Sequence, residues 1–197
     1  MTLATQTRAN DNQFESATWK IFRHGPHGSI ESSLENLRDE QIVVSESVPD
    51  VLKKMNIMDV LQTLDTDVEL VRIKTHQLGL TRPTIPHLLE VAVKNGLVPC
   101  PGMVALRLWL QYPDLLENGE KVRVPTNLIW SSVWTEARPV FTLGNYEMNE
   151  HKWLKSKLPR DDRRWQGRSL HAHIHGSDHT SWDDEWIFTR GKRGDVN

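Results

Sequence analysis

The 197-residue sequence lacks several features that mark particular classes of protein, and each absence excludes one such class or site. A single cysteine, Cys100, excludes an intrachain disulfide and a cysteine-based zinc site, and is typical of a reducing compartment. No apolar run approaches the ~18 residues of a membrane span, so no membrane partner is expected. Residues 1–12 have no apolar core, so we expect no secretory signal. The sequence therefore predicts a soluble, cytoplasmic protein.

The rest of the composition is that of an ordinary globular protein. Hydrophobic residues make up 38% and charged residues 25% of the chain, which is too apolar for a disordered protein. The aromatic residues are unusual only in their makeup, with eight Trp against two Tyr and four Phe. We predict a single domain over residues 17–190, between a disordered leader (1–16) and a tail (191–197).

The order of the expected elements predicts an α+β fold. Short helices are expected after Ser29 and near Pro49, and one well-defined central helix follows Thr84 and ends at Gly96. Strands are expected at residues 19–22, 42–44, 68–73, 103–112, 122–130, 139–143 and 186–189. Asn118-Gly119 is typical of a hairpin turn. We therefore expect N-terminal short helices followed by a mainly antiparallel sheet, interrupted by a long polar excursion over residues 145–181.

One motif in the middle of the chain resembles a known family. It consists of Gly96-Leu97, Cys100-Pro101 and, six residues later, Leu108-Trp109-Leu110-Gln111-Tyr112-Pro113-Asp114. This run resembles the signature (GLxxCP, then LRLQYxD) of an uncharacterised family of bacterial hypothetical proteins, and the likeness extends over roughly residues 19–190. The chain departs from the family at Trp109, where arginine is usual, and in its histidine-rich stretch. The family has no known activity, so the resemblance implies a bacterial origin and a shared fold unit.

The cysteine and several tryptophans are expected to be structural. No cationic or basic partner for the Cys100 thiol can be identified from spacing, so this residue is predicted to fill the core. Four tryptophans are expected to pack in the sheet or beneath the loops, namely Trp130, Trp134, Trp182 and Trp186.

A run of alternating histidines is the strongest candidate for chemistry. On a strand, alternate residues project from one face about 6.5 Å apart, and adjacent imidazoles can share a divalent transition metal such as zinc. The competing interpretation is an exposed polar loop or edge strand with solvated histidines. The predicted metal ligands are His171, His173, His175 and His179.

Two enzyme families share part of this spacing. His-x-His-x-His resembles the histidine-triad nucleotide hydrolases and transferases, which would make His173 the nucleophile between His171 and His175. However, Gly176 and the serine after it stand where that family has apolar strand residues. The metallo-β-lactamase motif resembles residues 173–179 with one residue too many, and too little chain follows for the later ligands of that fold. The alternative function is therefore a histidine-dependent nucleotide hydrolase or ribonuclease, with or without a metal, that uses the histidine run over residues 171–179.

A basic segment with interleaved tryptophans precedes the histidines. Residues 152–168 hold seven basic and two acidic residues, a charge of +5 in a chain of net charge −2. This composition is typical of a surface that contacts RNA or a single strand, although a solvated loop anchored by its tryptophans would have the same composition. We predict a non-catalytic binding module that uses the surface near residues 145–181 to bind a protein or RNA partner. Its predicted binding residues are Lys152, Trp153, Arg163, Arg164, Trp165 and Arg168.

Overall fold

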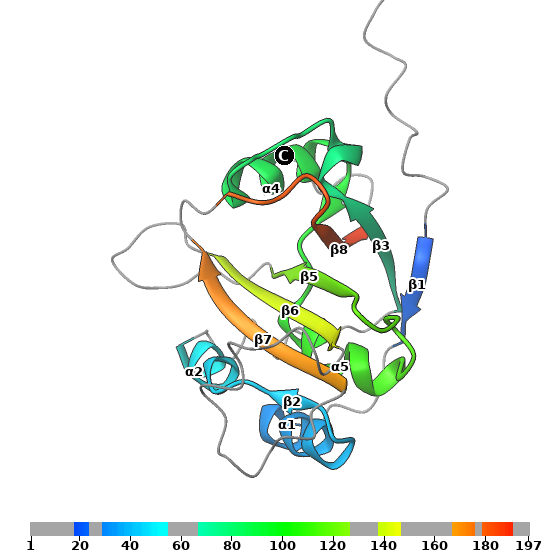
Figure 1. The fold of residues 1–197 in the computed structure, drawn as a ribbon, viewed down its shortest axis with the longest axis vertical. Helices are drawn as coiled ribbons and strands as arrows, with labels where there is room; N and C mark the ends of the chain where they lie inside the picture. Colours follow the sequence, from blue (N-terminus) through cyan, green and yellow to red (C-terminus); the bar gives the residue numbers. More distant parts are fainter. Residues whose placement is uncertain are drawn as a thin grey trace, which may run out of the picture.

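The computed structural model describes residues 18–23, 29–54, 67–126, 138–146, 167–175 and 179–190. Within these ranges the chain forms one eight-stranded sheet and four α-helices (Figure 1). Most strand pairs are antiparallel, and only β2–β7 and β5–β8 are parallel. The predicted α+β class with a mainly antiparallel sheet is confirmed.

The elements follow one another in an interleaved order. The strands are β1 (Thr18–Phe22), β2 (Val43–Val44), β3 (Val68–Lys74), β4 (Leu97–Val98), β5 (Lys121–Pro125), β6 (Arg138–Tyr146), β7 (Gly167–His175) and β8 (Glu185–Arg190). The helices are α1 (Ile30–Asp39), α2 (Ser47–Lys54), α4 (Ile85–Lys94) and α5 (Gly102–Gln111), with a 3-10 helix η1 (Thr75–Leu78). The spatial order of the strands is β1-β3-β8-β5-β6-β7-β2, and β4 also pairs with β8. The expected sequence of helices first and sheet afterwards is therefore too simple. In the part of the chain described, no helix combines the length and the apolar character needed to cross a membrane.

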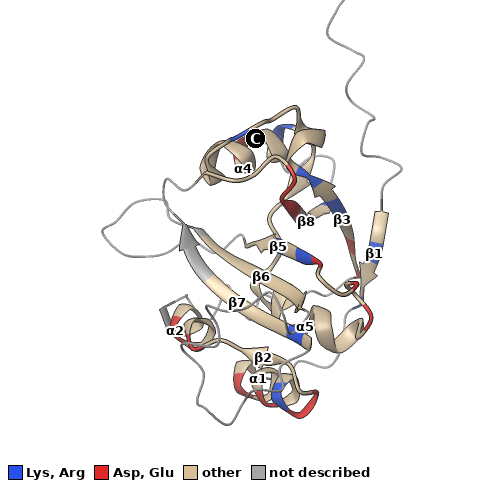
Figure 2. Cartoon of the chain, viewed as in Figure 1, with Lys and Arg blue, Asp and Glu red and all other residues tan. Residues whose placement is uncertain are grey.

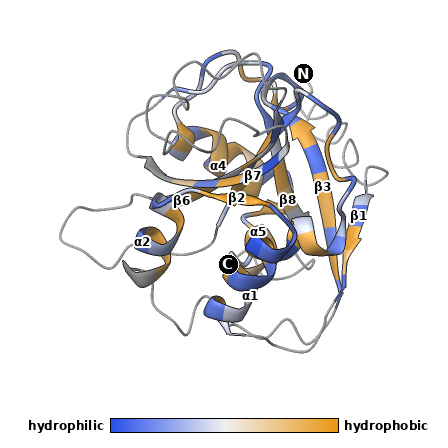
Figure 3. Ribbon diagram, turned by 60° about the horizontal axis from the view of Figure 1, so that its bottom comes forward, coloured by the Kyte–Doolittle hydropathy of each residue, from blue (hydrophilic) through white to orange (hydrophobic). Residues whose placement is uncertain are grey.

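The sheet has a hydrophobic core on each face. Leu70, Phe141 and Ile187 pack in the core that includes α1, α2 and α5, whereas Trp186 and Phe188 pack in the core that includes η1 and α4. Neighbouring residues of β8 enter different cores because successive strand residues point to opposite faces. Figure 3 accordingly shows α4 on one side of the sheet and α1, α2 and α5 on the other.

Helix α5 corrects the prediction of a strand over residues 103–112. Arg107, Leu110 and Gln111 are only half-buried, while the other seven of its ten residues are buried. A helix enclosed on nearly every side shows no apolar period of 3.6 residues in its sequence. The alternation of leucines in this segment therefore resembles a strand. As a consequence, the Asn118-Gly119 turn joins α5 to β5 and does not close a β-hairpin. Gly119 has a φ of +84°, which is typical of a turn glycine.

Strand β7 corrects part of the polar excursion predicted for residues 145–181. It lies between β6 and β2, antiparallel to the first and parallel to the second. Leu170 and Ala172 are buried in the core that includes α1, α2 and α5, and His171 on the alternate face is also buried. Residues 167–172 are therefore not the exposed loop that their polar side chains suggested. Residues 147–166 and 176–178 lie outside the described ranges.

Candidate functional site

The predicted histidine site is described only in part. His171 lies on β7 opposite Thr142 with 8% of its surface exposed, and His179 forms an isolated bridge with Thr84 just before α4. The side chains of His173 and His175 lie outside the described residues. Among the side chains that the structure describes, no three His, Cys, Asp or Glu residues are grouped as metal ligands. The described side chains of His171 and His179 therefore belong to no group of three metal ligands, and zinc binding stays a prediction.

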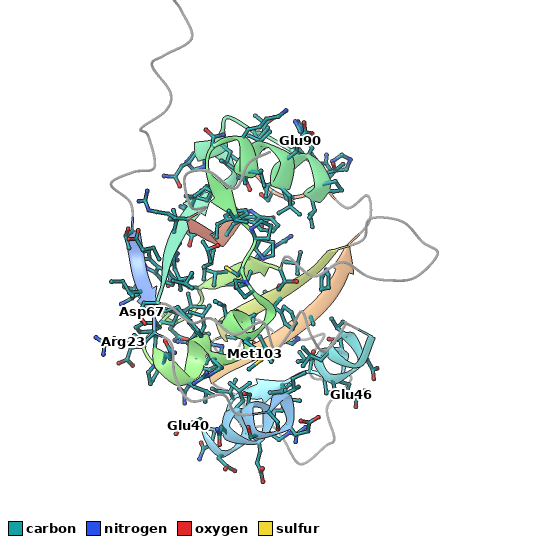
Figure 4. All side chains as sticks on the ribbon, turned by 180° about the vertical axis from the view of Figure 1, so that it is seen from behind. Arg23, Glu40, Glu46, Asp67, Glu90 and Met103 are labelled. Atoms are coloured by element: carbon teal, nitrogen blue, oxygen red, sulfur yellow. The ribbon has the colours of Figure 1, made fainter. Side chains whose placement is uncertain are left out.

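The predicted basic surface is described at Arg168 alone. The other predicted binding residues of residues 152–165 lie outside the described ranges. Arg168 donates a hydrogen bond from Nη2 to the backbone carbonyl of Glu40 at 2.7 Å, and lies 3.8 Å from the Glu40 carboxylate. Glu40 is the cap residue that follows α1, near the bottom of Figure 4. Arg168 therefore joins β7 to the end of α1.

Cys100 lies in the core, as predicted, and its thiol is 0% exposed and donates to the carbonyl of Ile187 at 3.4 Å. Burial raises the pKa of the Cys100 thiol, which keeps it protonated and unreactive. We expect the native protein to react with a disulfide reagent roughly 1,000-fold or more slowly than the denatured protein, since only rare openings expose the thiol. The measurement is the absorbance of the thiolate released with and without denaturant. Similar rates in both states would show that the thiol is accessible.

Trp182 is the most exposed large hydrophobic side chain in the described residues, at 54%. The prediction that it packs in the sheet or beneath a loop is wrong, whereas Trp186 is fully buried as expected. The backbone N–H of Asp184 donates to the carbonyl of Ser181 at 3.2 Å. This bond closes a four-residue turn with Trp182 and Asp183 at its centre, which places the indole at the tip of the turn.

An ion pair between the buried Asp184 and the half-buried Arg123 holds the base of this turn. The Asp184 carboxylate accepts a hydrogen bond from the Ser181 N–H at 2.7 Å and lies 3.1 Å from the guanidinium of Arg123 on β5. The side chain of Asp184 is 6% exposed and that of Arg123 is 22% exposed. Figure 2 shows this arrangement more broadly, with basic residues of β3 and β5 beside acidic residues at the start of β8. The ion pair between Asp184 and Arg123 thus fixes the turn to β5 of the sheet.

The first two residues of η1, which follows β3, also bond to the turn. The N–H of Thr75 donates to the carbonyl of Asp184 at 3.0 Å, and the N–H of His76 donates to the carbonyl of Trp182 at 3.1 Å. The His76 and Trp182 rings have centroids 5.0 Å apart and planes tilted by 43°. These contacts fix both the backbone of the turn and one side of the indole.

The segment before the turn is held against the start of α4. Thr180 donates from its N–H to the carbonyl of Pro83 at 2.9 Å, and His179 donates from Nδ1 to the carbonyl of Arg82 at 3.2 Å. The bridge between His179 and Thr84 continues this pairing. In Figure 1 the segment is the orange-red stretch that passes α4 and enters β8. Hydrogen bonds to the residues before α4 therefore hold the chain immediately before the Trp182 turn.

A surface hollow of about 430 Å³ lies beside the Trp182 side chain. Among the lining residues that the structure describes, Arg82 is the only lysine or arginine, and none is acidic. Arg82 is exposed and forms no ion pair with any acidic residue of the described ranges. We call this feature the Trp182 hollow, and it is lined by Thr81, Arg82, His179, Thr180, Ser181 and Trp182.

A second hollow, of about 560 Å³, lies between α1 and α5, and two of its polar residues, Gln111 and Glu40, are engaged with residues outside these helices. The Gln111 side chain donates to the carbonyl of Arg23 at 2.7 Å and accepts from the Arg23 N–H at 3.0 Å. Glu40 is bonded to Arg168 on β7. These contacts hold β7 and Arg23, the residue after β1, to the helices. None of the described lining residues is aromatic, so the second hollow is a weaker candidate than the Trp182 hollow.

The sequence carries a signal for the exposed turn that the apolar character of Trp182 obscures. Ser181, Asp183 and Asp184 are all residue types that favour turns, and they surround the tryptophan immediately before a strand. A tryptophan at the centre of such a run is expected at the tip of the turn. Arg82 gives no comparable signal, because only the pairing of residues 179–180 with 82–84 places it near Trp182.

Comparison with known proteins adds no relative. No family model matches the chain, and no match is found among curated proteins or among solved structures. The resemblance to the bacterial family stays a prediction. In the structure its motif residues have structural roles, since Gly96 follows α4 with φ of +74°, Pro101 precedes α5 and Cys100 is buried. Function is therefore inferred from the geometry of the Trp182 hollow.

Proposed function

We propose that the protein is a non-catalytic binding module whose contact surface is the Trp182 hollow. The observation that carries this proposal is a tryptophan that stays 54% exposed at the tip of a hydrogen-bonded turn. Apolar surface left in water forgoes about 25 cal/mol per Å² of stabilisation, so a partner that covers the indole would recover it. Tryptophan and arginine are also enriched among the residues that dominate binding energy at interfaces.

The rigidity of the turn supports the same function. A side chain that is already held in place loses less conformational entropy when a partner binds than one that must first be ordered. The turn has this property because the ion pair of Asp184 and the backbone bonds of Thr75 and His76 hold it from two sides.

The proposed surface lies at the C-terminal border of the region predicted from the sequence, residues 145–181. The alternative function, a hydrolase that uses the histidine run, receives no support from His171, whose side chain is buried in β7. A binding module requires only the exposed group that Trp182 supplies.

Comparing three forms of the tagged protein tests the proposed function. Wild-type protein, Trp182→Ala and Ile21→Ala are incubated with a bacterial lysate, and the retained proteins and nucleic acids are identified and quantified. We expect at least one component to be retained about 10-fold less by Trp182→Ala, the size of a hot-spot loss. Ile21 is the matched control, because it is the other exposed large hydrophobic residue of the described ranges, at 49%.

The control separates binding from folding. Both variants remove an exposed side chain, so each is expected to keep the wild-type melting temperature and to change stability by no more than about 0.5 kcal/mol. If all three forms retain the same components in the same amounts, Trp182 is not the contact surface and the proposed function is wrong.

A further inference from the structure

The chemistry around Trp182 indicates what kind of partner the module binds. We propose that the Trp182 hollow binds single-stranded nucleic acid, with one base stacked on the Trp182 indole and a neighbouring phosphate on Arg82. This proposal rests on the proposed function and names the ligand class of the same site.

The indole offers a stacking platform. Contact with the His76 ring at 5.0 Å fixes the orientation of Trp182, and 54% of the residue's surface stays open to solvent. Aromatic side chains on which bases stack are the main source of sequence-tolerant affinity for single strands. Bases within a duplex are stacked on one another, so a ring of this kind selects unpaired bases.

The charge of the hollow suits a phosphate. Arg82 is exposed, and no acidic residue of the described ranges pairs with it, so its guanidinium keeps its donors for a ligand. Its backbone is fixed by the hydrogen bond from His179, which keeps it beside the indole. The exposed hydroxyls of Thr81 and Ser181 add neutral donors to the same wall. Asp183, which follows Trp182 in the sequence, does not line the hollow and lies 3.9 Å from Nδ1 of His76.

The isolation of the ring favours a nucleic acid over a folded protein partner. A stable protein interface covers about 800 Å² per partner and has an apolar centre formed by several residues. The only other exposed large hydrophobic residue in the described ranges is Ile21, which pairs with Glu69 near the start of β3. Trp182 contacts His76 just beyond the end of β3, roughly 20 Å away along the strand direction. In the part of the surface that the structure describes, one ring lies beside one unpaired cation, which is enough for base stacking but is not the centre of an apolar interface.

Binding of end-labelled oligonucleotides, followed by fluorescence anisotropy, tests the proposal. The probes are oligo-dT and oligo-U of about 12 nucleotides, a length that a single-strand site can cover, and a duplex of the same length. We expect wild-type protein to prefer the single strands. Trp182→Ala should weaken binding about 5- to 100-fold, as expected for the loss of one stacked base, and Trp182→Phe should restore part of the affinity.

Arginine variants test the phosphate contact separately. Arg82→Ala should weaken binding to all sequences alike and lower the salt slope by about one between about 50 mM and about 200 mM salt. Arg82→Lys should keep most of that slope, since it keeps the charge. The matched control is Lys94→Ala, which removes another exposed cation at the far end of α4, where Lys94 pairs with Glu90 at 2.6 Å. Figure 4 shows Glu90 on the outer side of this helix. Lys94→Ala and Ile21→Ala should both bind within about two-fold of wild type, because each lies away from the proposed contact.

Several results would overturn the proposal. The first is that wild-type protein binds none of the oligonucleotides, and the second is that it binds duplex and single strand with equal affinity. The third is that Lys94→Ala loses as much affinity as Arg82→Ala. Each of these results contradicts the proposal. If oligonucleotides do not bind but the lysate experiment shows a protein retained only when Trp182 is present, the nucleic-acid proposal fails and the binding function stands. If Trp182→Ala changes neither experiment, both fail.

Discussion

Replacing Trp109 with alanine is expected to lower the free energy of unfolding by about 4 kcal/mol, a large share of the roughly 5–15 kcal/mol of a typical domain. The Trp109 side chain is 1% exposed, and its Nε1 donates to the backbone carbonyl of Ser169 at 3.0 Å. Alanine would leave a cavity between α5 and β7 and a buried carbonyl without its donor. Urea unfolding followed by far-ultraviolet circular dichroism measures the loss independently of tryptophan fluorescence.

Two further substitutions separate the causes of this loss. Trp109→Phe keeps most of the ring but removes the N–H, so it should cost about 1–2 kcal/mol. Trp182→Ala makes the same chemical change at an exposed position and should change stability by no more than about 0.5 kcal/mol. If Trp109→Ala were no more destabilising than Trp182→Ala, the result would contradict the packing of Trp109 between α5 and β7.

The two central helices show what sequence patterning can and cannot reveal. The buried residues of α4 lie on one face (Ile85, Leu88, Leu89 and Ala92), so their spacing follows the helical period. Helix α5 is buried on almost every side, and that period disappears. The remaining signal is helix propensity, since alanine, leucine, methionine, arginine and glutamine dominate residues 103–111. Propensity is weaker than patterning, and the alternating leucines favour a strand.

The candidate site was harder to predict than the sheet. Leu170, Ala172 and Ile174 alternate as strand residues do, but the histidines between them look like solvated groups. That His171 is buried follows from its place between β6 and β2, which are distant from it in sequence. The Trp182 hollow likewise joins residues 81–82 to residues 179–182, a pairing that no local pattern contains.

Asp184 connects the stability of the fold to the proposed site. Its carboxylate accepts from the Ser181 N–H and pairs with Arg123, while its carbonyl accepts from Thr75. The guanidinium of Arg123 also lies 5.3 Å from the centre of the Trp186 ring, in the core between the sheet and α4. One buried side chain therefore holds the turn that presents Trp182 without touching the proposed ligand.

Asp184→Ala should accordingly lower the free energy of unfolding by about 3 kcal/mol. This is the lower end of the cost of breaking a buried ion pair, because Arg123 is 22% exposed and regains some water. Hydrogen exchange gives a second, local measurement. The Ser181 amide loses its carboxylate acceptor in the variant, so it should exchange faster relative to amides of β3 than it does in the wild type.

Asp184→Asn is the matched variant, because an asparagine oxygen can still accept from Ser181 while the charge opposite Arg123 is lost. The variant should keep much of the protection of the Ser181 amide against hydrogen exchange, but its free energy of unfolding should stay below that of the wild type. If the turn exists to present Trp182, Asp184→Ala should weaken oligonucleotide binding under conditions where the protein is still folded, and Asp184→Asn should weaken it less. Unchanged binding in folded Asp184→Ala would mean that Trp182 does not depend on this ion pair for its position. The pair would then stabilise the fold alone, and rigidity would no longer support the proposed function.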